Sequence, residues 1–153
     1  MATVYSVQQT NATADPVVKN PSNVLGGRIR VAHGVYEASS LASGDVIQMF
    51  TLPDGARLLE GSLAHDALGG STTLSVGYAA HTNSAGTAVS AAAAAYKAAA
   101  ASTSAQKVDI LATLALGSGT VTDTNEDGMI VTATMGGAAG TGTIEVTIKY
   151  VVD

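Results

Sequence analysis

The chain has 153 residues and a mass of 15.1 kDa, a length that predicts one domain with at most an extended arm added. Hydrophobic residues make up 46% of it, but there is one Phe, no Trp and only 12% charge, so alanine supplies much of the hydrophobicity. The net charge of −5 and the scattered basic residues argue against nucleic acid or an anionic membrane as partner, and the lack of Cys excludes disulfides and cysteine-based sites.

Residues 1–25 are predicted to form an extended arm rather than a helix, because Pro16 and Pro21 bias the backbone around them towards extended geometry. Burying a medium apolar side chain returns ~1.5–3 kcal/mol, whereas ordering the backbone costs ~1–2 kcal/mol per residue. The arm therefore cannot order alone, and we expect it to contact its own sheet, a sister subunit or a different protein; the alternative is a frayed terminus. The side chains expected to make this contact are Val4, Tyr5, Val7, Val17 and Val18.

The start of the chain lacks the basic and apolar regions of a signal peptide, and no apolar run reaches the ~18 residues of a membrane helix. We therefore expect a protein that is made in the cytoplasm and binds no membrane.

From Gly26 onward, short apolar segments alternate with turn residues, which predicts a single β-sandwich domain over residues 26–153. Residues 28–36 alternate, with Ile29, Val31, His33 and Val35 on one face. Residues 45–52 and 57–64 flank a Pro-Asp-Gly turn and are predicted to form a hairpin, and residues 72–79 another strand. Residues 129–135 and 143–152 are predicted to form a second hairpin. In its last strand one face is predicted to be half-buried: Ile144, Val146, Ile148, Tyr150 and Val152. The other face consists of Thr143, Glu145, Thr147 and Lys149.

Two segments lack the alternating pattern. Residues 88–101 are rich in alanine, which predicts a short helix inserted between strands. Its stripe of Ala93, Tyr96 and Ala100 is the predicted trimer contact, with a helix that covers one end of its own sheet as the alternative. Residues 108–116 fit a strand or a helix. The whole pattern predicts an all-β fold, an antiparallel β-sandwich or jelly roll with an N-terminal arm.

Few residues offer chemistry. Asp123, Asn125 and Asp127 precede a glycine with the spacing of the first half of a calcium loop, but position twelve is Thr134, so an acidic turn is the alternative. His33, His65 and His81 lie on separate segments without ligand spacing. No pair of carboxylates or nucleophile and base is apparent. We therefore predict no catalytic residue, no metal and no cofactor, and a protein that is not an enzyme.

Four segments are similar to one known family: Gly-Gly-Arg-Ile-Arg-Val at 26–31, the stretches 36–61 and 65–77, and the C-terminal Ile-Glu-Val-Thr-Ile-Lys-Tyr-Val-Val-Asp. The chain resembles the head decoration or cement proteins of short-tailed bacteriophages, especially phages of aquatic bacteria. The likeness covers roughly residues 1–79 and 129–153 and leaves out the alanine tract, which looks like a variable insertion.

The resemblance implies a β-sandwich or jelly-roll domain that forms a homotrimer on the outer capsid surface of the virion. It implies the phage major capsid protein as partner, a non-enzymatic role in stabilising contacts between capsomers, synthesis in the host cytoplasm, and no nucleic acid, membrane or small-molecule substrate. The alternative from the residues is a virion-associated or calcium-dependent carbohydrate-binding adhesin, which the absence of Trp disfavours.

Overall fold

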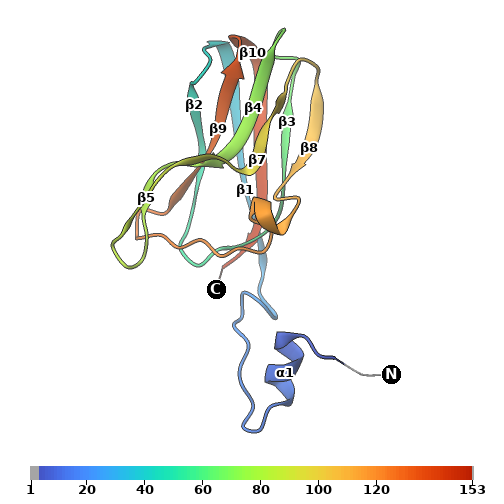
Figure 1. Cartoon of the computed structure of the whole chain (residues 1–153), viewed down its shortest axis with the longest axis vertical. Helices are drawn as coiled ribbons and strands as arrows, with labels where there is room; N and C mark the ends of the chain where they lie inside the picture. The colour runs from blue at the N-terminus through green and yellow to red at the C-terminus, as the bar shows by residue number, and fades with distance from the viewer. Residues whose placement is uncertain (1–3, 153) are drawn as a thin grey trace.

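The computed structural model describes residues 4–152 and contains two opposed antiparallel sheets of four strands each (Figure 1). Sheet A consists, in spatial order, of β1 (Ile29–Leu41), β10 (Gly140–Val151), β3 (Arg57–His65) and β8 (Gln106–Ile110). Sheet B consists of β2 (Val46–Leu52), β9 (Met129–Gly137), β4 (Thr72–Tyr78) and β7 (Ala92–Ala101). Successive strands of the two sheets exchange between them, except β4 and β7, which pair within sheet B. This is the arrangement of a jelly roll, and it confirms the predicted all-β class.

The remaining elements are short. A two-stranded ribbon is formed by β5 (His81–Thr82) and β6 (Ala88–Val89), and one 3₁₀ turn, η1, spans Leu114–Leu116. Residues 4–25 of the arm contain a single helical element, α1 (Val7–Thr13). None of the helices in the described chain has the length and apolar character needed to cross a bilayer.

The core lies between the sheets and is filled by aliphatic side chains. In β10, Ile144, Val146 and Ile148 are fully buried while the residues between them face outward, as the alternation predicted. The prediction is wrong at the end of the strand, where the pairing with β3 shifts register after Lys149: Val151 is buried, and Tyr150 and Val152 are only partly buried. From the facing sheet, Leu74 and Val76 of β4 enter the same core. A cluster of Val, Leu, Ile and Met with almost no aromatic groups therefore holds the sandwich together, each buried side chain contributing ~1.5–3 kcal/mol.

Both predicted hairpins are wrong. β2 and β3 are joined by the predicted Pro-Asp-Gly turn, in which Gly55 has φ of +70°, but the two strands lie in different sheets. β9 and β10 are likewise adjacent in sequence and lie in opposite sheets. The apolar face of an alternating strand is buried equally well whether the next strand pairs with it or lies in the opposite sheet. The pattern therefore predicts the strands but not their partners.

The predicted alanine helix is also wrong, because residues 92–101 form the edge strand β7. This strand pairs with β4 through two register shifts. The two strands come so close that a Cβ on Gly77 would lie 1.8 Å from the carbonyl oxygen of Ala92. The helix propensity of alanine is worth a few tenths of a kcal/mol per residue over other good helix formers, and backbone pairing to β4 together with burial of Tyr96 outweighs it.

Residues 108–116, which fitted a strand or a helix, begin as the end of β8 and finish as η1. Thr113 accepts a hydrogen bond from the backbone N–H of Leu116 (3.3 Å), and Gly117 ends the turn with φ of +84°. Residues 108–110 are therefore a strand, because they pair with β3, and residues 114–116 form a helical turn.

Candidate interaction surfaces

The prediction of an extended arm without a helix is wrong over residues 7–13, which form α1, and the arm folds back on itself. Ser6 caps α1 by accepting a hydrogen bond from the N–H of Gln9 (3.2 Å), and residues 7–13 contain neither Pro nor Gly, so one short helix can form. The Asn11 amide donates to Asn20 (3.0 Å), which in turn donates to the carbonyl of Gln8 (3.1 Å). These bonds hold the segment after Pro16 against the helix.

The predicted contact residues of the arm are all exposed. Their side chains are 89% exposed at Val4, 64% at Tyr5, 70% at Val7, 68% at Val17 and 50% at Val18, and α1 has no buried residue. Figure 1 shows the arm (blue) leaving one end of the sandwich, away from both sheets. One hydrogen bond from the arm reaches the sandwich, from Asn23 to the carbonyl of Gly55 (3.4 Å). The arm therefore presents apolar surface that its own chain leaves uncovered.

The predicted trimer stripe is not one surface. Tyr96 is 4% exposed and points into the core, where its ring lies 5.9 Å from that of Tyr78. Its hydroxyl donates to the sulfur of Met129 (3.6 Å), and burial raises its pKa above the ordinary value. Ala93 is exposed and Ala100 is half-buried. The helical spacing that joined the three residues is absent in a strand, and their contact with a second copy stays a prediction.

A surface that the sequence analysis did not single out lies on β1, the edge strand of sheet A. Val31, His33 and Val35 are directly opposite Lys149, Thr147 and Glu145 of β10, and the ring of His33 hydrogen-bonds to Thr147 (2.9 Å). These side chains therefore lie on the outer face of the sheet. We call the three exposed apolar residues of this face the β1 stripe, which comprises Ile29, Val31 and Val35, exposed by 64%, 60% and 55%.

The inner face of β1 explains why its large residues point outward. Gly34 lies against β2, where an added Cβ would come within 2.7 Å of the carbonyl oxygen of Met49. Ala32 and Ala38 occupy neighbouring positions on the same face. No side chain fits at Gly34, although Tyr36, two residues later on the same face, is accommodated with 39% exposure. The small residues at 32 and 34 are the signal that could have identified the outward direction of Ile29, Val31 and Val35.

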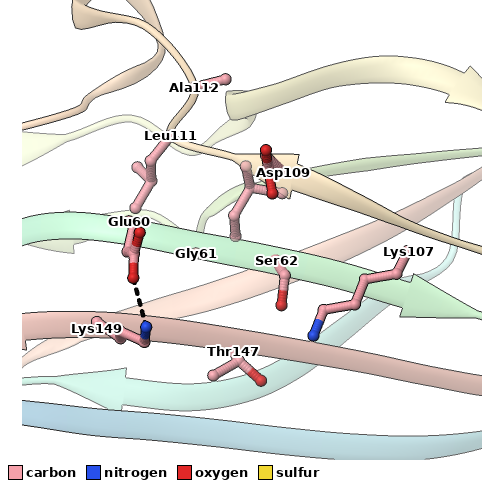
Figure 2. Close-up of a pocket in the computed structure, with 10 residues that line it drawn as sticks. Glu60, Gly61, Ser62, Lys107, Asp109, Leu111, Ala112, Thr147 and Lys149 are labelled. Carbon is pink, nitrogen blue, oxygen red and sulfur yellow. Dashed lines mark hydrogen bonds and ion pairs between the residues drawn. The ribbon is translucent and has the colours of Figure 1, made fainter.

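The outer face of sheet A also carries a shallow hollow of about 460 Å³, shown in Figure 2. Its polar lining includes the ion pair Glu60–Lys149, together with Lys107 and Asp109 of the edge strand β8. Both signs of charge alternate around it and no nucleophile is paired with a base. The hollow is a solvated, charge-balanced surface and offers no evident chemistry.

The segment 123–128, called here the acidic loop, is the one whose spacing matches the first half of a calcium loop. Asp123 accepts hydrogen bonds from the hydroxyl (2.6 Å) and N–H (3.0 Å) of Ser84, which lower its pKa. Asn125 is engaged with Asp127 through its amide (2.8 Å) and its carbonyl oxygen (3.2 Å). Among residues 4–152, no three His, Cys, Asp or Glu side chains come close enough to hold a metal ion. The side-chain oxygens of Asp123, Asn125 and Asp127 are engaged with Ser84 and with one another.

The three histidines lie apart. His65 is buried at the end of β3, where its ring bonds to the backbone carbonyl of Asp66 (2.7 Å) and approaches the amide of Gln106 (3.3 Å). His81 of β5 packs edge-on against Tyr78 at 5.4 Å, and His33 belongs to the outer face of β1. Each has a local structural partner.

Comparison with known proteins relates the chain to others by fold. No protein-family profile and no curated protein sequence matches it. Among solved structures, a chain of the cyanophage Pam1 capsid asymmetric unit aligns over 100% of both chains, with a TM-score of 0.64 and 20% identity. A chain of the capsid of Ralstonia phage GP4 aligns over 83% of this chain and 86% of its own, with a TM-score of 0.61 and 24% identity.

A third similar structure, of infectious bursal disease virus strain Gx, covers 81% of this chain but 32% of its own, with a TM-score of 0.50 and 14% identity. At these identities the common property is the sandwich fold.

Proposed function

We propose that this protein is a non-enzymatic structural protein of a tailed-phage virion, which binds the outer capsid surface and stabilises contacts between capsomers. The observation that carries the proposal is the fold match over the full length of a chain in the cyanophage Pam1 capsid. That match includes the arm as well as the sandwich, since it covers 100% of both chains. The motif resemblance of segments 26–31, 36–61, 65–77 and 144–153 to decoration proteins supports the finer assignment.

The surfaces suit this role. An arm with exposed Val and Tyr side chains can bury them on a partner and can add backbone hydrogen bonds at a sheet edge. An acidic chain is better placed on the outside of a head than against packaged DNA. The major capsid protein is therefore the proposed partner, and the arm the proposed contact to the capsid or to a sister subunit.

The physical mechanism is linkage between binding and assembly. A protein that binds the closed shell but not separate capsid subunits stabilises the shell by RT ln(1 + [L]/Kd), about 2.7 kcal/mol at 100 times Kd. In the proposed homotrimer, three domains engage together, so that weak single contacts give a long-lived attachment. Neither effect needs a reactive group.

The proposal is tested on heads assembled from the major capsid protein encoded in the same genome. The purified protein should bind expanded heads, should not bind free capsid subunits, and should raise the melting temperature of the heads as its concentration rises. Lack of binding to heads, or equal binding to free subunits, would contradict the function.

The arm is tested separately by deleting residues 2–20. The shortened chain should keep the melting temperature of the sandwich, because no residue of α1 is buried, and should lose occupancy on expanded heads. Unchanged occupancy would overturn the role of the arm and leave the structural function standing.

A further inference from the structure

Of the three histidines, all within residues 4–152, His65 is the one whose two ring nitrogens are both engaged. The residue is 7% exposed at the end of β3, and its Nδ1 lies 2.7 Å from the carbonyl oxygen of Asp66. Its Nε2 lies 3.3 Å from the amide nitrogen of Gln106. A carbonyl oxygen only accepts hydrogen bonds and an amide nitrogen only donates them, so Nδ1 carries the proton and Nε2 is bare. The two contacts together select one form of the ring, the neutral imidazole protonated on Nδ1.

The side-chain amide of Gln106 is held by a second hydrogen bond. Its nitrogen also donates to the carbonyl oxygen of Ala101 (2.9 Å), so turning the amide over would place two acceptors against each other. The resulting chain of hydrogen bonds, called here the His65 clasp, runs from Ala101 through Gln106 and His65 to Asp66. It joins the end of β7 to the start of β8, which are edge strands of opposite sheets.

A second proton on His65 is incompatible with the clasp. The imidazolium carries N–H groups on both nitrogens, so its Nε2–H would face the N–H of the Gln106 amide. Two donors cannot bond to each other, and turning the amide over would break its bond to Ala101. A buried donor that is left without a partner costs more than one in water. Protonation of the ring therefore requires the clasp to open.

The other two histidines have no such conflict. The hydroxyl of Thr147 beside His33 can donate or accept, so it serves either form of that ring. Nδ1 of His81 bonds to the carbonyl oxygen of Ala79 (3.1 Å), and no hydrogen bond of the described chain occupies its Nε2. A second proton on either ring breaks no bond that the structure contains. His33 is therefore a matched control for His65.

The charged groups around the clasp are few. In the segments 66–72 and 101–106, Asp66 is the only titratable side chain. Glu145 of β10 lines the same shallow hollow as the clasp, and Lys107 of β8 follows directly in sequence. The two carboxylates attract an imidazolium and the lysine repels it. Asp66 is exposed and Glu145 is half-buried, and exposed charges in water contribute little, so the conflict between the two donors decides the response.

We propose that His65 is a pH-sensitive clasp between the edge strands of the two sheets, closed when the ring is neutral and opened by protonation. Histidine changes charge between about pH 5 and 8, and in the unfolded chain the ring takes up a proton without losing a contact. The stability that the clasp supplies is therefore complete above this range and is lost as the pH falls through it. The clasp lies at the end of β3 that pairs with Ile144, whereas the arm joins the sheet at its other end, beside Val151. The inference does not rest on the proposed function.

Thermal melts of the purified full-length protein and its Gln106→Glu variant test the clasp at about pH 7.5 and about pH 5. Gln106 is exposed, so the variant should fold. Near pH 7.5 the carboxylate cannot donate to His65 or Ala101, and we expect the variant to melt about 2–4 °C below the parent. Near pH 5 the carboxylate is still ionised and accepts from the imidazolium, so we expect the variant to melt above the parent. The control His33→Gln should keep the parent's response to pH.

The order of the two melting temperatures is the decisive result. If Gln106→Glu melts below the parent at both pH values, or above it at both, the clasp is overturned. The form of the ring gives a second readout, because ¹⁵N NMR distinguishes a protonated from a bare ring nitrogen. We expect Nε2 of His65 to be bare near pH 7.5, and a proton on Nε2 at that pH would also overturn the proposal.

Amide hydrogen exchange locates the opening. The N–H of Ser102 bonds to the carbonyl oxygen of Thr72 (3.0 Å) at the base of the connection between β7 and β8. After correction for the intrinsic rate, this N–H should lose protection near pH 5 in the parent and keep it in Gln106→Glu, relative to the amides of β1. Equal protection of Ser102 at both pH values in the parent would contradict an opening at this end.

Discussion

Replacement of Tyr96 tests whether the alanine tract is an edge strand anchored in the core. The side chain is 4% exposed and packs against Tyr78 and Met129. Gly117 also lies close to its ring, since a Cβ added to this glycine would be 3.2 Å from the ring atoms. A buried aromatic residue covers ~150–250 Å², which at ~25 cal/mol per Å² is about 4–6 kcal/mol. Truncation of buried Phe or Trp to Ala costs ~3–5 kcal/mol, and we expect that range for Tyr96→Ala.

The assay is urea unfolding followed by far-UV circular dichroism. With a slope of about 2 kcal/mol per M, the Tyr96→Ala midpoint should fall by about 1.5–2.5 M. Tyr96→Phe keeps the ring and loses one weak hydrogen bond to sulfur, so it should cost no more than about 1 kcal/mol. Ala93→Ser on the exposed side should stay within about 0.5 kcal/mol. A loss below about 1 kcal/mol for Tyr96→Ala would refute the placement of this residue in the core.

The same residue predicts a dependence on alkaline pH. Burial raises the pKa of Tyr96 in the folded protein, while in the unfolded chain it ionises near the ordinary value of ~10. Below that pH both states keep the proton and the contribution to stability is complete. As pH rises above it, the unfolded state loses the proton first and folding becomes less favourable. The Tyr96→Phe variant lacks this loss, so its stability relative to the parent should increase between pH 9 and 11; an unchanged difference would contradict the assignment.

Three further predictions follow from local contacts. Gly77→Ala should destabilise the sandwich by ~1–3 kcal/mol, since its Cβ would overlap the carbonyl of Ala92. The control Gly70→Ala has open space around it and should keep the parent melting temperature. Equal effects of the two substitutions in thermal melts would rule out the close approach of β4 and β7. The N–H of Thr143 donates to Asp66 and lowers the pKa of the Asp66 carboxyl, so the NMR titration midpoint of Asp66 should lie below 3.8. The stability that this hydrogen bond supplies is present above pH 3.8 and declines as the pH falls through the lowered pKa. Millimolar calcium should leave the melting temperature unchanged relative to chelator, because the oxygens of the acidic loop are engaged with one another and with Ser84; a saturable rise would restore the calcium hypothesis.

Much of the sandwich was predictable from residue patterns. The alternation in the last strand predicted which side chains of β10 enter the core up to Ile148, and the burial of Ile144, Val146 and Ile148 confirms it, whereas Val151 is buried after the register shift. The all-β class followed from short segments between turns. These predictions succeed because the choice between core and solvent is repeated every second residue, and each repetition contributes a favourable burial energy of its own.

The candidate surfaces were predictable only in part. The apolar residues of the arm could be singled out because a segment with Pro16 and Pro21 and so few apolar groups cannot order alone. Of the three contacts expected for them, the structure excludes burial on the chain's own sheet, since all five side chains are exposed, and the contact with a subunit or another protein stays a prediction. For the β1 stripe, the sequence predicted that its residues share one face of a strand but not that this face points to solvent. Its outward direction depends on Gly34 lying against β2, a contact between segments that the pattern of β1 alone does not contain.

The tertiary structure decided the pairing of strands and the conformation of the alanine tract. Sequence neighbours such as β2 and β3 lie in opposite sheets, while β1 pairs with β10 from the far end of the chain. Alternation is a property of one strand, whereas pairing is a property of two strands whose relative positions depend on all the others. For the same reason the tract around Tyr96 is a strand: alanine's preference for a helix is small and local, and the free edge of β4, which exists only in the assembled sheet, outweighs it.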